Sequence, residues 1–374
     1  MGSGRYPDAA ILVAIMKPSR TANDPGDTDR PHAHGPDAGR GPVRSGPEGR
    51  RARDPAELLA AARSGDRGAV GRLLSLLERG GDAARAVGRL TFAAGSRPDQ
   101  VVGITGAPGA GKSTLTDHLI REARADGRRV GVLAVDPSSP FSGGAILGDR
   151  IRMQNHALEE DVFIRSMATR GHQGGLALAT PEAIRVLVAA GLAFVLVETV
   201  GVGQVEVEVA GEADTTVVVV NPGWGDAVQA SKAGLLEVAD VFAVNKADRP
   251  GAAETERDLE GMLDMNMSMG DWRPPVVLTT ASTGEGVDRL WSAVVAHHQY
   301  LQSSGELAKR RERRLVVELQ KVLTWRLERD VKAMRGGAPF QEVAAEVVAL
   351  LIDPYQGADR LVRMTRDEDP TGGP

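Results

Sequence analysis

The most informative stretch of this chain is a glycine-rich loop that ends in lysine and serine. Residues 106–113 read G-A-P-G-A-G-K-S, a complete G-x-x-x-x-G-K-[ST] pattern, between an apolar run at 101–105 and a predicted helix at 114–125. In such a strand–loop–helix unit, backbone N–H groups surround phosphate oxygens, the lysine contacts the β- and γ-phosphates, and the serine hydroxyl can bind Mg²⁺. The predicted phosphate site comprises Gly106, Ala107, Pro108, Gly109, Ala110, Gly111, Lys112, Ser113 and Thr114, with Lys112 also a candidate catalytic residue.

A second motif predicts which base the site prefers. The apolar run 241–244 ends in Asn245, Lys246 and, two residues later, Asp248, an N-K-x-D element. The Asp248 carboxylate can accept hydrogen bonds from N1–H and the exocyclic amine of guanine, whereas adenine has no donor at N1. Charge-assisted bonds of this kind are worth about 1.5–3 kcal/mol each, so the motif favours guanine. The next predicted strand ends in Thr280, Ala281 and Ser282, where the guanine-binding loop of GTPases offers backbone N–H groups to O6.

Oxygen-bearing side chains follow several predicted strands, as a magnesium site requires. The candidate ligands are Ser113, Asp136, Asp149 and Glu198. Ordinary capping of loops and helices is the alternative for the three acids. Glu198 begins an E-T-V-G element, and Val202 follows its glycine where Ras-type GTPases place a water-orienting glutamine. We therefore expect slow intrinsic hydrolysis, with the catalytic site completed by a partner or by a second switch segment.

The use of lysine singles out one further residue. Arginine outnumbers lysine 38 to 7, so the chain uses arginine wherever a generic cation is enough. Between residues 99 and 302 the lysines are Lys112, Lys232 and Lys246, and two of these belong to the nucleotide motifs. Lys232 is either an ordinary surface lysine or a mobile cation that reaches the γ-phosphate during hydrolysis.

Seven short β-branched runs alternate with helical stretches after residue 99. They lie at 101–105, 130–135, 162–165, 194–198, 215–221, 241–245 and 276–280. Runs this continuously apolar are typical of parallel strands covered on both faces. The pattern predicts an α/β fold with a doubly wound, mostly parallel sheet and a P-loop GTPase core, whose nucleotide lies across the carboxyl ends of the strands.

Helical extensions and polar tails are predicted on both sides of this core. The expected organisation is a disordered tail at 1–52, a helical extension at 53–97, the nucleotide domain at 98–302, a helical C-terminal arm at 303–365 and a disordered tail at 366–374. Two short amphipathic helices are expected in the first extension. In the arm, we expect helices at 306–331 and 341–352, the first with leucines at 315, 319, 323 and 327. That stripe either packs on the core or forms a dimerisation seam.

Composition narrows the classes of partner and compartment. The net charge of −5 argues against nucleic acid as the main partner, and no apolar run reaches the roughly 18–20 residues that span a bilayer. The apolar stretch at 9–16 is too short for a span and lacks a basic flank before it. The absence of cysteine excludes disulfides and thiolate metal sites and agrees with a cytoplasmic protein.

The combination of motifs resembles one family of nucleotide-binding proteins. The motifs lie at 135–140 (V-D-P-S-S-P), 143–144, 148–150, 170–171, 174–176, 198–204 (E-T-V-G-V-G-Q) and 225–226. From about residue 55 to 361 the chain is similar to the methylmalonyl-CoA mutase-associated GTPases of the MeaB or ArgK type, in the SIMIBI class of P-loop GTPases. The resemblance implies a homodimeric chaperone that binds GTP and Mg²⁺, gates delivery of adenosylcobalamin to methylmalonyl-CoA mutase, and protects or reactivates that enzyme.

The resemblance also adds a switch segment at 221–235, in which Asp226 and Lys232 are the candidate catalytic residues. Two short segments depart from the family pattern. Val205 stands where the family commonly has serine, and Ala227-Val228 stand where it has Glu-Leu. Both departures lie in switch segments, so they bear on partner contacts and timing rather than on nucleotide binding.

Three other functions are weaker interpretations of the same motifs. A transport-associated kinase or ATPase conflicts with the guanine motif. A nickel-inserting GTPase holds its metal with Cys and His clusters, and this chain has no cysteine. A signal-recognition-type GTPase requires an RNA- or membrane-facing module, and the sequence contains neither a methionine-lined groove nor a strongly basic domain.

Overall fold

The computed structural model describes residues 54–136, 156, 159–168, 175–199, 211–223, 237–265 and 271–367. The tail predicted at 1–52 lies outside these ranges. The tail predicted at 366–374 begins too early, because the last helix continues to Asp367.

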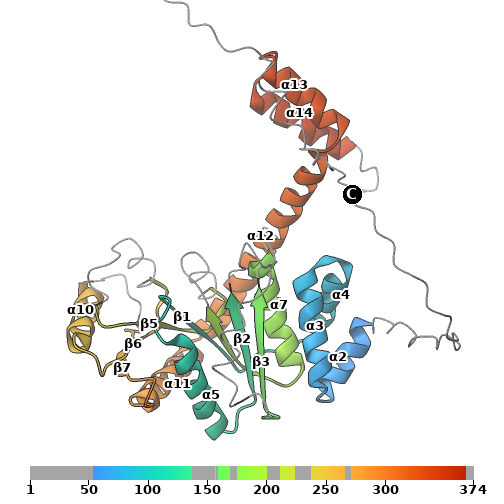
Figure 1. Cartoon of the computed structure of the whole chain (residues 1–374). Coiled ribbons are helices and arrows are strands. Elements are labelled where there is room, and N and C mark those ends of the chain that lie inside the picture. The colour runs from blue at the N-terminus through green and yellow to red at the C-terminus, as the bar shows by residue number, and fades with distance from the viewer. Residues whose placement is uncertain are drawn as a thin grey trace, which may run out of the picture. The chain divides into compact units, whose positions relative to one another are not determined.

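The core is a seven-stranded sheet in the order β3-β2-β4-β1-β5-β6-β7, and all neighbouring strands are parallel (Figure 1). The strands are β1 (Gln100–Gly106), β2 (Val130–Asp136), β3 (Val162–Ala168), β4 (Phe194–Thr199), β5 (Thr215–Val220), β6 (Val241–Asn245) and β7 (Val276–Thr279). The strand order reverses at β1, because β2, β3 and β4 lie on one side of it and β5, β6 and β7 lie on the other. A ligand site is expected at the carboxyl ends of strands beside such a switch point.

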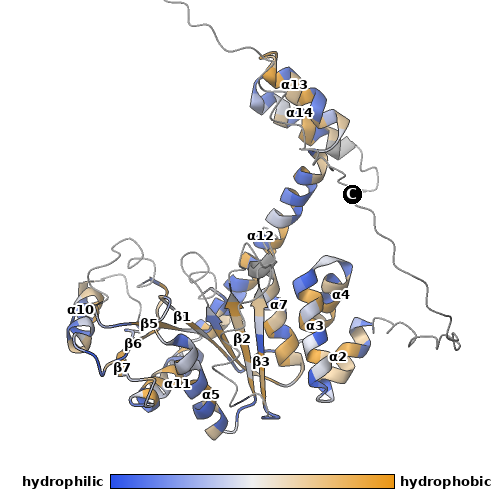
Figure 2. Ribbon diagram, in the orientation of Figure 1, coloured by the Kyte–Doolittle hydropathy of each residue, from blue (hydrophilic) through white to orange (hydrophobic). Residues whose placement is uncertain are grey.

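Helices cover both faces of the sheet, because successive residues of a strand point to opposite sides. Val217 and Val219 of β5 pack with α5 (Lys112–Ala125) and α11 (Val287–Ser303), whereas Val218 and Val220 pack with α10 (Ala252–Met265). Helix α7 (Gly175–Ala189) covers β1, β2 and β4 on the same face as α10. Figure 2 shows the central strands as mostly apolar. The predicted fold class and all seven predicted strands are confirmed.

Three helices precede the sheet, where the sequence predicts two. They are α2 (Pro55–Arg63), α3 (Arg67–Arg79) and α4 (Gly81–Ala93). The first of them begins with a capping residue, since Asp54 accepts a hydrogen bond from Ala56 N at 3.1 Å and Pro55 occupies the first turn. Helix α4 escapes prediction because two glycines with positive φ stand at its start, Gly80 as the cap and Gly81 as the first residue, and its buried residues are mostly small. These helices pack against α7 in a shared apolar core.

The C-terminal arm consists of α12 (Glu306–Met334), α13 (Ala338–Val348) and α14 (Pro354–Asp367). The first turns of α12 are attached to the amino ends of β5 and β6. Arg311 and Arg314 pair with Asp214, and Arg310 pairs with Asp240 at 2.9 Å. Burial raises the pKa of Asp214, but the hydrogen bond from Arg311 and the charge of Arg314 outweigh it and leave the pKa below its ordinary value.

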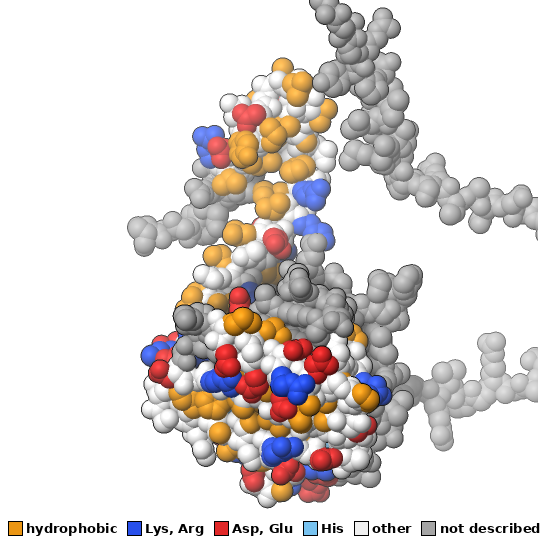
Figure 3. Space-filling view, turned by 90° about the vertical axis from the view of Figure 1, so that its left-hand side faces the viewer, with side chains coloured by type: hydrophobic (Ala, Val, Ile, Leu, Met, Phe, Trp, Pro, Cys, Tyr) orange, Lys and Arg blue, Asp and Glu red, His pale blue; other side chains and the backbone are white. Residues whose placement is uncertain are grey.

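Beyond this attachment, the leucine stripe of α12 does not pack on the core. Leu319, Leu323 and Leu327 are 67%, 54% and 58% exposed, and none of the residues of α12 is buried. Figure 3 shows apolar side chains at the surface of the arm. Of the two alternatives that the sequence left open, packing onto the core is therefore wrong for these leucines. Helix α14 lies mostly within the helical arm predicted at 303–365 but was not predicted as a separate helix, and the helix predicted at 341–352 ends at Val348.

None of the helices in the described ranges combines the length and apolar character needed to cross a bilayer.

Candidate nucleotide-binding site

The glycine-rich loop lies between the carboxyl end of β1 and the first turn of α5, beside the switch point of the sheet. Two of its glycines are required by close backbone and side-chain contacts. A Cβ on Gly106, whose φ is +134°, would lie 2.0 Å from the carbonyl oxygen of Val219. A Cβ on Gly111, whose φ is +97°, would lie 2.2 Å from Asn245 Nδ2. The loop can therefore adopt this course only with glycine at both positions.

Lys112 begins helix α5 and folds its side chain back over the loop. Its Nζ donates to the carbonyl oxygens of Gly106 at 2.5 Å and Ala107 at 3.1 Å, and the side chain is buried. The ammonium group thus lies at the helix N-terminus, where the backbone N–H groups and the helix dipole both favour an anion. This arrangement suits the β- and γ-phosphates of a nucleotide.

Asn245, at the end of β6, connects the glycine-rich loop with the loop that follows β7. Its Nδ2 donates to Ala110 O at 2.7 Å. Its Oδ1 accepts from Ala281 N at 3.0 Å and from the Thr279 hydroxyl at 3.3 Å. The side chain is only 1% exposed. Asn245 therefore positions both predicted halves of the nucleotide site.

The rest of the N-K-x-D element forms a tight turn beside the same loop. Lys246 has a left-handed backbone, with φ +61°, and its Nζ donates to Gly109 O at 2.6 Å. The turn leaves Asp248 exposed past the end of β6. An exposed carboxylate at this edge is open to the donor groups of a guanine base, so the role predicted for Asp248 stays a prediction.

The structure narrows the prediction for the loop at 280–282. Thr280 N donates to Glu285 O at 2.9 Å, and Ala281 N is held by Asn245. Within the described ranges, the N–H of Ser282 donates to no other group. Of the N–H groups of residues 280–282, that of Ser282 is therefore the one without a hydrogen bond in the described part of the chain, and it is the candidate donor to guanine O6.

Ser113 and Glu198 meet at the carboxyl ends of β1 and β4, which are neighbours in the sheet. The Ser113 hydroxyl donates to Glu198 Oε1 at 2.5 Å, and the Thr116 hydroxyl donates to Oε2 at 3.0 Å. Glu198 is 1% exposed. A carboxylate and a hydroxyl oxygen beside a phosphate cradle are the donors that Mg²⁺ prefers. Because Mg²⁺ keeps several waters and binds phosphate oxygens, it fits here although the described residues contain no group of three acidic, cysteine or histidine side chains arranged to hold a metal ion.

Of the other predicted ligands and catalytic residues, the structure describes only the backbone of Asp136. Asp136 ends β2, which pairs with β4 in a register that sets Val135 beside Thr199, so its backbone lies at the same edge as Glu198. Its side chain, together with Asp149, Asp226 and Lys232, lies outside the described residues.

Sequence reasoning missed two residues of the site. Thr116 lies one turn after Ser113 on α5 and shares its carboxylate partner. His118, on the same helix, contacts the loop after β7, where its Nε2 lies 2.8 Å from Ala281 O. The three-residue spacing of Thr116 from Ser113 was an available signal. No local pattern connects His118 to residue 281.

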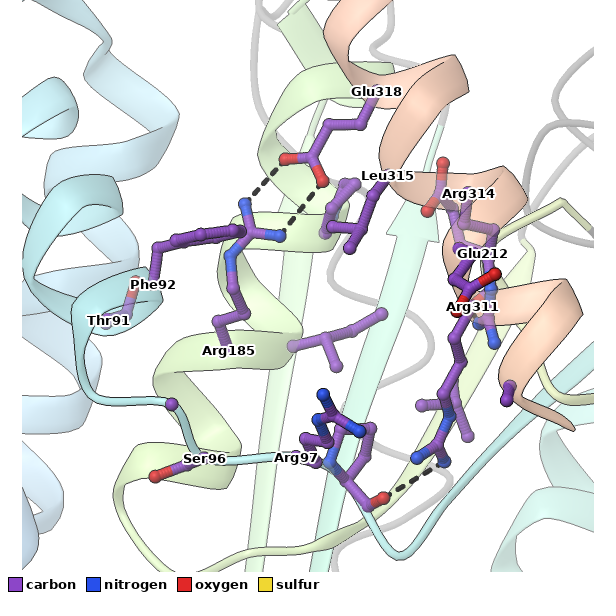
Figure 4. Close-up of a pocket in the computed structure, with 17 residues that line it drawn as sticks. Thr91, Phe92, Ser96, Arg97, Arg185, Glu212, Arg311, Arg314, Leu315 and Glu318 are labelled. Carbon is purple, nitrogen blue, oxygen red and sulfur yellow. Dashed lines mark hydrogen bonds and ion pairs between the residues drawn. The ribbon is translucent and has the colours of Figure 1, made fainter.

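A separate cavity of about 390 Å³ lies where α4, α7 and α12 meet (Figure 4). It borders the start of β1 and the segment before β5, at the strand ends opposite the glycine-rich loop. Arg185 of α7 makes two hydrogen bonds to Glu318 of α12, at 3.0 and 2.6 Å. Burial raises the pKa of nearby Glu182 to about 7, while Arg185 lowers it and Glu318 raises it. The pair of Arg185 with Glu318 holds α12 to α7.

A parallel sheet with a glycine-rich loop at its switch point, followed by Lys-Ser and an N-K-x-D element, defines a P-loop GTPase fold. The sequence pattern of the family described as "Methylmalonyl Co-A mutase-associated GTPase MeaB" matches residues 71–335. The chain belongs to this family.

Individual relatives agree with that assignment. A protein of Pyrococcus abyssi that is named as a GTPase is 47% identical to this chain over 310 residues. The match covers 82% of this chain and 95% of the relative. "Methylmalonic aciduria type A homolog, mitochondrial" of Mus musculus is 34% identical over 269 residues, or 70% of this chain and 64% of the relative. The crystal structure described as "LAO/AO transport system kinase" aligns with a TM-score of 0.62 at 27% identity, covering 83% of this chain and 97% of that one.

Proposed function

We propose that this protein binds GTP with Mg²⁺, hydrolyses it to GDP and phosphate, and serves as a chaperone for an adenosylcobalamin-dependent methylmalonyl-CoA mutase. The observation that carries the nucleotide proposal is the bridge made by Asn245. One buried amide joins the phosphate loop at Ala110 to the base loop at Ala281. A site built for phosphate alone would not need this second connection. The exposed Asp248 beside it supplies the acceptor for guanine.

In hydrolysis, a water attacks the γ-phosphorus while the bond to the β–γ bridging oxygen breaks and that oxygen leaves with the GDP. Lys112 and the loop N–H groups hold the phosphates and stabilise the charge that develops on them. Ser113 and Glu198 would hold Mg²⁺, with Asp136 and Asp149 as the remaining proposed ligands. When bound, the ion neutralises phosphate charge. We assign to Asp226 and Lys232 the completion of the site after β5.

The proposed client rests on names carried by relatives. The family is described by its association with methylmalonyl-CoA mutase, and the mouse relative carries the name of methylmalonic aciduria. Gating of adenosylcobalamin delivery, and protection or reactivation of the mutase, are the parts of this proposal that need direct tests. Two rivals remain for comparison, a nickel-insertion GTPase and a transport-associated kinase.

We also propose that two copies of the chain pair through α12. The leucines at 315, 319, 323 and 327 are each roughly half exposed or more and lie on one face of a 29-residue helix. An apolar stripe of this length is covered most simply by the same stripe of a second copy, since a twofold interface uses one surface twice.

The enzymatic proposal is tested by measuring phosphate release from GTP with Mg²⁺, alone and with purified mutase. We expect a slow basal rate, at least about a tenfold increase with the mutase, and loss of both with Lys112→Ala. A Lys232→Ala protein should keep its GDP affinity and lose the stimulated rate. Release of phosphate from ATP as fast as from GTP would contradict the proposal.

The client is tested by capture from native lysate on the protein loaded with a non-hydrolysable GTP analogue. Recovery of a cobalamin-dependent mutase subunit, and no recovery with the nucleotide-free protein, is the expected result. Capture of a nickel enzyme or of a transporter in its place would overturn the choice of client.

The dimer is tested by sedimentation of Leu319→Lys/Leu323→Lys against Thr324→Lys, which adds charge beside the stripe on the same helix. The double variant should be monomeric and the control dimeric. If the unsubstituted protein sediments as a monomer, the dimer proposal fails.

A further inference from the structure

Helix α5 reaches the base-recognition loop through one side chain. The helix begins at the phosphate loop with Lys112, and His118 lies two turns farther along, half-buried. His118 Nε2 lies 2.8 Å from the carbonyl oxygen of Ala281. Because a carbonyl oxygen only accepts, Nε2 must carry the hydrogen in this contact.

This bond fixes the direction of the next N–H group. The carbonyl of Ala281 and the N–H of Ser282 belong to the same peptide unit, which is planar and trans, so the two groups point in opposite directions. On the other side of the residue, Ala281 N is held by Asn245 Oδ1 at 3.0 Å. Residue 281 is therefore held at both of its polar backbone groups. Ser282 N–H then points away from His118, and it has no acceptor in the described part of the chain.

The loop is shaped to receive the imidazole ring. Gly284 has φ +84°, and a Cβ there would lie 3.1 Å from His118 Cε1. Thr283 N and Gly284 N both donate to Thr280 O, at 3.0 and 2.9 Å, which closes the loop into a tight turn over the ring. The contact between His118 and Ala281 thus belongs to a packed and hydrogen-bonded unit.

We propose that His118 is a positioning residue for guanine recognition, which aims the Ser282 N–H at O6 of the base. This inference rests on the proposed function, since it concerns the same site. A hydrogen bond to the carbonyl polarises the peptide unit and makes the Ser282 N–H a stronger donor. The same side chain ties the base loop to the helix whose N-terminus holds the phosphates, so both ends of the nucleotide are held relative to one rigid element.

The test measures affinities for three related nucleotides by calorimetry, and ADP is titrated separately to test the preference for the base. GDP is the reference. In 6-thio-GDP a sulfur, which is a weaker acceptor, replaces O6, whereas IDP keeps O6 and lacks the 2-amino group that Asp248 would bind. The variants are His118→Phe, which keeps a ring without the donor, and His118→Gln, which offers an amide donor at a similar reach. Thermal unfolding of each variant confirms that it is folded.

The unsubstituted protein should bind GDP about threefold to tenfold more tightly than 6-thio-GDP, as one hydrogen bond predicts. In His118→Phe that ratio should fall to about one or two, while the ratio of GDP to IDP stays unchanged. His118→Gln should restore most of the first ratio. If His118→Phe weakens all three nucleotides by the same factor, or keeps the full GDP to 6-thio-GDP ratio, His118 only packs and the inference is overturned. If the unsubstituted protein shows no preference for GDP over ADP, the proposed function itself fails.

Discussion

Replacement of Asn245 by alanine is the perturbation whose cost is best defined by the structure. The side chain is 1% exposed and makes bonds of 2.7 Å to Ala110 O and 3.0 Å to Ala281 N, with a longer one to Thr279. Its removal leaves a buried carbonyl and a buried N–H without their partner. Each such group costs about 1–3 kcal/mol, so Asn245→Ala should lose about 2–4 kcal/mol of stability, allowing for water entering the space.

The same variant should bind nucleotide poorly. The bonds that it loses hold the phosphate loop and the base loop in place, and 1.4 kcal/mol corresponds to a factor of ten in affinity. We expect GDP affinity to fall by at least about tenfold in calorimetry, and the urea midpoint to fall without a change in the m-value. Thr279→Val is the matched control, since it removes only the 3.3 Å bond. Full GDP affinity in Asn245→Ala would refute the bridging role.

Two further substitutions test the metal pair and the raised pKa of Glu182. Glu198→Gln keeps the shape of the side chain but removes its charge, so the Mg²⁺ concentration that supports half-maximal GTP binding should rise by about tenfold; an unchanged Mg²⁺ titration would exclude Glu198 as a ligand. Burial raises the pKa of Glu182 from 4.5 to about 7, so the folded protein keeps a proton that the unfolded chain releases, and stability falls as the pH rises between these values. Glu182→Gln should therefore be more stable than the unsubstituted protein above pH 7, by up to about 3 kcal/mol in urea unfolding, and no more stable near pH 4.5; a difference that is the same at both pH values would contradict the assignment.

The sheet and the phosphate loop were predictable because their signals are local. A strand such as 241–245 is apolar at every position up to Asn245, and the glycine-rich loop is contiguous in sequence. The motif predicted a glycine at position 111 but not the contact that requires it. Its physical cause, the Asn245 amide 2.2 Å from where a Cβ would lie, joins residues 134 positions apart.

Other features depend on tertiary contacts that no local pattern records. Helix α4 begins at two glycines, Gly80 and Gly81, and buries mostly small residues, so its apolar period is weak, yet packing against α7 stabilises it. The contact of His118 with Ala281 spans 163 positions. For α12, the stripe at 315–327 was visible in the sequence, but only the structure shows that its leucines stay exposed in a single copy.

The most direct test of the account is competition of unlabelled nucleotides for a fluorescent GDP bound to the protein with Mg²⁺. If the phosphate loop and the exposed Asp248 together form a guanine nucleotide site, GDP and GTP will displace the label at concentrations at least about tenfold lower than ADP and ATP, and Asp248→Ala will lose this preference. Equal displacement by guanine and adenine nucleotides would contradict the central claim.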